Sequence, residues 1–98
     1  MCTYIVEHAD LAGSAKGQLG WFPLNRAHVA FDHPVSAPLD HALLIDFVNE
    51  AQGPGARVAV ELSAESARDL AFAILTALKA AEAENVVEPG LVGAVPQP

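Results

Sequence analysis

Two histidines stand at the two ends of a short link between stretches that both favour β-structure. The segment FDHPVSAPLDHALLIDF, residues 31–47, carries His33 before the link and His41 after it. If the flanking strands pair antiparallel, the two side chains lie opposite each other, with Cβ atoms about 5 Å apart. Two imidazoles at that separation can share one metal ion. The first chemistry that the sequence indicates is therefore metal binding at one rim of a sheet.

The single cysteine, Cys2, is the predicted third ligand. A first strand antiparallel to the second would begin beside the end of the second, near His33. One thiolate and two imidazoles suit zinc, copper or iron and leave a fourth position for water or substrate. Asp32 and Asp40 are predicted to orient the imidazoles. In the alternative reading, the histidines only flank a turn and bond to these aspartates, and Cys2 is a small apolar residue.

Two further groups of residues suggest other chemistry. His28 is predicted to lie opposite Asp46, and an imidazole held by a carboxylate is the basis of general base catalysis. The alternative is a weak cross-strand surface contact. Trp21 and Phe22 follow the glycine-containing segment GSAKGQLG. They are predicted either to cover a small-molecule ligand near Trp21 or to anchor the core at one end of the sheet.

The elements that must position these residues follow from local composition. Residues 2–8, 21–33, 41–48 and 57–62 are rich in β-formers and are predicted strands, whereas the glycine-containing stretch 9–20 is a predicted loop. Ser63 is a predicted N-cap for a helix over residues 64–84. Its apolar stripe recurs at helical spacing and comprises Ala67, Leu70, Ala71, Ile74, Leu78 and Ala81. Residues 85–98 form an apolar tail containing Pro and Gly.

The hydrophobic alternation predicts the register. Antiparallel pairing of Phe31 with Leu43 and Val29 with Ile45, continued to a fourth strand with Val60 beside Ile45, places these apolar side chains on one face. A slip of one residue would turn all of them to the other face, so this register is favoured. We therefore predict an α+β fold over residues 1–84: a four-stranded antiparallel sheet with one long C-terminal helix packed on its apolar face.

Bulk composition excludes several functional classes. The 98 residues carry 12 Asp and Glu against 5 Lys and Arg, a net charge of -7, which argues against binding to nucleic acid or to an anionic membrane. No apolar stretch approaches the roughly 20 residues of a membrane span, and the N-terminus does not resemble a secretion signal. We expect an acidic cytoplasmic protein. Its mixed second sheet face, or its tail, is predicted to form a homodimer.

Several segments resemble a family of small uncharacterised bacterial proteins of about this length. They are MCTYIVE, GSAKGQLGWFP, FDHP, IDF and GPGARVAVELSAESARDLA, and the likeness spans residues 1 to about 83. The resemblance implies no activity or cofactor. Three functions therefore stay open: a small metal-binding protein or metalloenzyme using His33, His41 and Cys2; a non-catalytic homodimeric or partner-binding protein; and a cofactor-free acid/base enzyme using His28 and Asp46.

Overall fold

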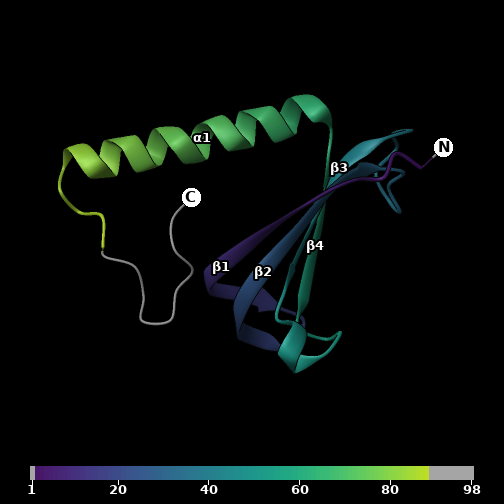
Figure 1. The fold of residues 1–98 in the computed structure, drawn as a ribbon, viewed down its shortest axis with the longest axis horizontal. Helices are drawn as coiled ribbons and strands as arrows, with labels where there is room; N and C mark the ends of the chain where they lie inside the picture. The colour runs from purple at the N-terminus through teal and green to yellow at the C-terminus, as the bar shows by residue number, and fades with distance from the viewer. Residues whose placement is uncertain (1, 89–98) are drawn as a thin grey trace.

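The computed structural model, which describes residues 2–88, has a β-meander followed by one long helix (Figure 1). The strands are β1 (Ile5–Gly17), β2 (Gly20–Asp32), β3 (Ala42–Val48) and β4 (Arg57–Leu62). They form one antiparallel sheet in the order β1-β2-β3-β4. A short 3-10 helix, Glu50–Gln52, lies between β3 and β4, and helix α1 spans Ala64–Ala83. The predicted α+β fold class is confirmed.

The register of the central strands is the predicted one. Phe31 pairs with Leu43, and Ile45 pairs with Val29 on one side and Val60 on the other. The apolar side chains therefore gather on one face because a strand's side chains alternate between its two faces. The helix start is also as predicted, since the Ser63 hydroxyl accepts a 3.1 Å hydrogen bond from the backbone N–H of Ser66.

The prediction of a loop over residues 9–20 was wrong. β1 continues to Gly17 and turns into β2 through the two residues Gln18 and Leu19. Gly20 closes this turn with a φ of 115°, a conformation that favours glycine. Midway along the hairpin the register shifts between Asp10 and Gly13, so two residues of β1 face one residue of β2 in a β-bulge. The bulge interrupts the alternation by which a strand is recognised in a sequence.

Helix α1 covers the apolar face only at its beginning. Its first turns lie beside β3 and β4, and the rest of the helix extends away from the sheet (Figure 1). None of its residues is buried. An open groove remains between helix and sheet, lined on the sheet side by Val29, Leu43, Ile45 and Leu62 and on the helix side mainly by Leu70, Ala71 and Ile74. Within the described residues, the buried apolar side chains are Phe22, Ala27, Ala42 and Ala56.

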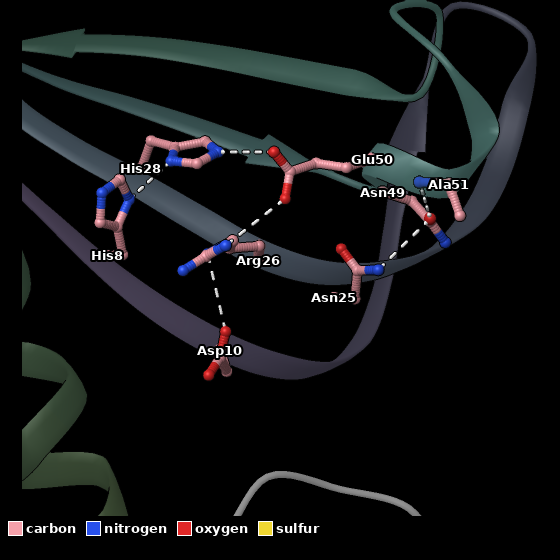
Figure 2. Close-up of polar contacts among 8 residues, drawn as sticks. All are labelled: His8, Asp10, Asn25, Arg26, His28, Asn49, Glu50 and Ala51. Carbon is pink, nitrogen blue, oxygen red and sulfur yellow. Dashed lines mark hydrogen bonds and ion pairs between the residues drawn. The ribbon is translucent and has the colours of Figure 1, made fainter.

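Asn49 is the buried polar residue that joins the turn after β3 to β2. Its Nδ2 donates to the carbonyl of Pro23 at 2.8 Å, and its Oδ1 accepts from the N–H of Ala51 at 3.1 Å and from Asn25 at 3.4 Å (Figure 2). We expect Asn49→Ala to lower the free energy of unfolding by about 2–3 kcal/mol, because it removes a cap and leaves a carbonyl without its donor.

Urea denaturation followed by circular dichroism measures this effect. Asn25→Ala is the matched control, since Asn25 is exposed and shares a single long hydrogen bond with Asn49. We expect it to change the free energy of unfolding by less than about 0.5 kcal/mol. Equal losses in the two variants would contradict the role given to Asn49.

No helix in the described part of the chain combines the length and the apolar character that crossing a membrane requires. Of the predicted tail, residues 85–88 follow the helix and are exposed, and residues 89–98 lie outside the described residues.

Candidate functional site

The two histidines of the β2–β3 link meet at the rim of the sheet. β2 and β3 are paired as far as Asp32 and Ala42, and His33 and His41 are the next residues outward. Their ring centroids are 4.5 Å apart, with 34° between the ring planes. His41 also stacks on Phe31, at 6.2 Å between centroids, on the apolar side of the sheet. The predicted meeting of the two imidazoles is therefore present.

Asp40 holds both rings through two different oxygens. Nδ1 of His33 is 2.9 Å from the main-chain carbonyl of Asp40, and Nδ1 of His41 is 3.0 Å from its carboxylate Oδ2. A carbonyl or an ionised carboxylate oxygen can only accept, so Nδ1 carries the proton in both rings. In a neutral imidazole the lone pair that binds metals then lies on Nε2. Metal-binding histidines are commonly held in this way, by an acceptor on the nitrogen that faces away from the metal.

Three side chains at this corner bring potential ligand atoms together. One donor atom each from His33, Asp40 and His41 lies within 4.8 Å of the others. Ligands of a tetrahedral zinc ion with bonds of 2.0–2.1 Å are about 3.3 Å apart. Side-chain rotation at an exposed rim can bring the two imidazole nitrogens to that separation. His33 and Asp40 are exposed, and His41 is half-buried.

Glu61 holds in place the β2–β3 link, which connects His33 to His41. From the end of β4, its carboxylate accepts three backbone hydrogen bonds: 2.6 Å from Val35, 2.9 Å from Ser36 and 2.8 Å from Ala37. The donation from Val35, with those from Ala37 and Ser36, lowers the pKa of Glu61 below its usual range. A proline-containing link between two strands is thus held in one conformation by a side chain from a third strand.

Asp32 takes another role than the predicted one, whereas the predicted role of Cys2 stays a prediction. The Thr3 hydroxyl donates to the carbonyl of Phe31, so the N-terminal segment does run beside the end of β2. Cys2 itself is exposed, and the group of donor atoms found among residues 2–88 does not include it. Asp32 accepts from the backbone N–H of His33 at 2.8 Å, so it fixes the start of the link instead of an imidazole.

His28 and Asp46 lie opposite each other in the register, as predicted, but their side chains contact other groups. Asp46 is paired with Arg57 at 2.6 Å. His28 lies with Nδ1 2.7 Å from Nδ1 of His8, and its Nε2 is 3.5 Å from Glu50 (Figure 2). The carboxylate at His28 is therefore that of Glu50, which follows β3.

A cation links this second histidine pair to the rest of the polar face. Arg26 lies between Asp10 and Glu50, 3.6 Å from each carboxylate (Figure 2). Sequence reasoning missed the contact of His28 with His8, because the register of β1 against β2 had too little hydrophobic alternation to be predicted. It also missed Glu50, which lies in the 3-10 helix beyond the strand and has no register position.

Trp21 and Phe22 separate into two environments. Phe22 is 9% exposed and belongs to the core, as predicted, whereas Trp21 is 70% exposed, so its prediction as a core anchor was wrong. Trp21 lines one side of a shallow hollow with Leu19, Gln52 and Gly55. A small-molecule ligand near Trp21 stays a prediction.

The comparisons with known proteins agree with the family resemblance seen in the sequence. The model of a family of unknown function, DUF6295, matches residues 1–87, which is most of the chain. No curated protein and no solved structure matches this chain. With a match over all four strands and the helix, the chain belongs to the family of unknown function DUF6295.

Proposed function

We propose that this protein binds one transition-metal ion at the rim corner formed by His33, Asp40 and His41. The observation that carries the proposal is the pair of contacts from Asp40, which place the proton of both rings on Nδ1 and the lone pair on Nε2. An acceptor on Nδ1 of each ring is the arrangement that commonly orients histidines that bind metals through Nε2.

The donor set indicates the class of metal. The two imidazole nitrogens, with Asp40 orienting the rings, suit zinc, copper and iron(II), and they bind magnesium or calcium poorly, since those ions prefer oxygen ligands. The remaining positions would be open to water or an incoming ligand. Cys2 stays a predicted additional ligand, because the N-terminal segment runs beside β2 close to the corner. The acidic net charge of -7 also favours cations over anions at the surface.

The polar face of the sheet supplies a matched control for the test. His8 and His28 also lie with their rings in contact, at 4.8 Å between centroids, but they lack the Asp40 arrangement. Titration calorimetry with zinc, and the visible absorption of bound cobalt(II), should show one ion per chain. In His33→Ala/His41→Ala the affinity should fall by more than about 100-fold, since loss of an outer partner alone costs about 10–100-fold.

The His8→Ala/His28→Ala variant should keep the affinity of the unmodified protein. A Cys2→Ser variant in the same titration shows whether the thiolate contributes, since the charge-transfer absorption of cobalt bound to sulfur would disappear. If zinc does not bind above the level of the His33→Ala/His41→Ala variant, or if both double variants lose affinity equally, the rim corner is not a metal site.

A further inference from the structure

Helix α1 presents an apolar stripe that its own sheet leaves largely open. Leu70, Ile74 and Leu78 are 44%, 51% and 49% exposed, although they occupy the stripe positions that normally face a core. In Figure 1 the helix leaves the sheet after its first turns, and only the first part of the stripe, as far as Ile74, lines the groove against the sheet. A stripe of this kind on a soluble protein marks a contact surface.

The exposed area is larger than a monomer of this size normally has. The chain exposes 7509 Å², whereas folded monomers of 10.2 kDa expose about 5,300 Å². Even when the eleven residues outside the described part are credited with the full area of an unfolded chain, an excess of about 1,000 Å² is left. A stable interface of standard size buries about 800 Å² on each partner. The excess area is therefore enough for one such interface.

The stripe is symmetric in sequence about Ile74. Going outward from Ile74 in either direction, this side of α1, the stripe together with Ala77, carries an alanine, then a leucine, then an alanine. These pairs are Ala71 with Ala77, Leu70 with Leu78, and Ala67 with Ala81. A two-fold axis at Ile74 would bring each residue of one copy against its counterpart in the other, with large side chains on large and small on small. An isologous contact requires this self-complementarity, because both partners use the same surface.

The charges beside the stripe agree with an antiparallel pair. Arg68 lies near the beginning of α1 and Glu82 near its end, and both side chains are exposed. At 100° per residue they project to the same side of the stripe. In an antiparallel pair, Arg68 of one copy lies near the partner copy's glutamate, and this contact occurs twice.

We propose that two copies of this chain associate through α1, packed antiparallel with the two-fold axis at Ile74, and that the partner's helix covers the open groove. This interface lies on the apolar side of the sheet. The sequence suggested a homodimer through the polar face or the tail and, in the partner-binding alternative, a contact through the helix and tail. The interface proposed here does not depend on metal binding. The alanines of the stripe allow the two helices to approach closely, while Leu70, Ile74 and Leu78 supply the apolar area.

Sedimentation equilibrium of the full chain tests the proposal. We expect twice the monomer mass of 10.2 kDa at micromolar concentrations. Ile74→Asp places two carboxylates against each other at the axis and should raise the dissociation constant by at least about 100-fold. Phe72→Asp is the matched control, because Phe72 lies on the opposite side of α1 and is exposed. It should leave the dimer intact.

A second set of variants keeps the test independent of any folding defect in Ile74→Asp. Arg68→Glu should weaken the dimer by about 10-fold, and the added Glu82→Arg exchange should restore it, because the contact charges are then reversed as a pair. A full chain that sediments as a monomer, with the groove covered by its own tail or by water, would overturn the proposal. So would a dimer that Phe72→Asp disrupts and Ile74→Asp does not.

Discussion

Replacing Phe22 by alanine should lower the free energy of unfolding by about 3–4 kcal/mol. Phe22 is the one large side chain among the buried apolar residues of the described chain, whose other members are all alanines. Its ring packs closely enough on β1 that a Cβ added at Gly17 would come within 3.1 Å of it. The substitution opens a cavity that these neighbours cannot close. Since domains of this size are stable by about 5–15 kcal/mol, the loss is a large fraction of the total.

Trp21→Ala is the matched control for this measurement. The two aromatic residues are adjacent in β2 and point to opposite faces, and Trp21 is largely exposed. We expect its removal to change the free energy of unfolding by less than about 1 kcal/mol. Chemical denaturation monitored by far-ultraviolet circular dichroism gives both values. If the two substitutions cost the same, the end of the sheet is packed differently from the arrangement described above.

Glu61→Gln should weaken metal binding at the rim corner by about 10–100-fold, although Glu61 is not itself a proposed ligand. The carboxylate accepts N–H groups at both of its oxygens. In glutamine one of these oxygens becomes an NH₂ group, which would face a backbone donor. The link between His33 and His41 then loses part of its anchor, and the two imidazoles spend less time in the geometry that binds one ion.

The effect of Glu61 has a definite direction with pH. Because its pKa in the folded protein is lowered from the ordinary 4.5, its contribution to stability is complete above that value. The contribution is lost as the pH falls through the lowered folded pKa. Hydrogen exchange of the Val35, Ser36 and Ala37 amides in the metal-free protein measures this directly. Exchange corrected for its intrinsic pH dependence should accelerate in that acid range.

The same exchange experiment includes a control for charge alone. Glu65→Gln removes one exposed negative charge from the first turn of α1 and leaves the link untouched. We expect protection of the link amides to be lost in Glu61→Gln at neutral pH and to be retained in Glu65→Gln. Equal protection in all three proteins at neutral pH would show that the link is held by contacts other than those of Glu61.

Those parts of the fold that rest on strong alternation could be predicted from the sequence. The pairing of Val29, Ile45 and Val60 followed from the cost of turning apolar side chains to solvent, and the meeting of His33 and His41 followed from the same register. The far half of β1 could not be predicted, because its residues are small or polar and a bulge changes their phase. A short hairpin turn without its usual residues gave no further signal.

The limits at the site have different physical causes. The sequence predicted that an aspartate would orient the rings. It did not predict that Asp40 does so through both its backbone carbonyl and its carboxylate, because that arrangement depends on the conformation of the link. Glu61 could be placed on the polar face but not against the link, whose path was unknown. The stripe of α1 predicted a buried face and could not say what buries it, because a hydrophobic pattern is the same whether the covering surface belongs to its own sheet or to a second copy.

The anchoring of the link by Glu61 has a consequence for the order of folding. Both histidines and Asp40 lie close together in the sequence and are synthesised at nearly the same time. Glu61, which anchors the link, follows 24–26 residues after the amides whose hydrogen bonds it accepts. A nascent chain that lacks β4 therefore carries all three residues of the corner but lacks the carboxylate that holds the link in place. Closing a loop of this length costs only a modest amount of chain entropy, so the delay comes from the assembly of the sheet. Binding of a metal ion at this corner would then indicate that β4 has joined the sheet.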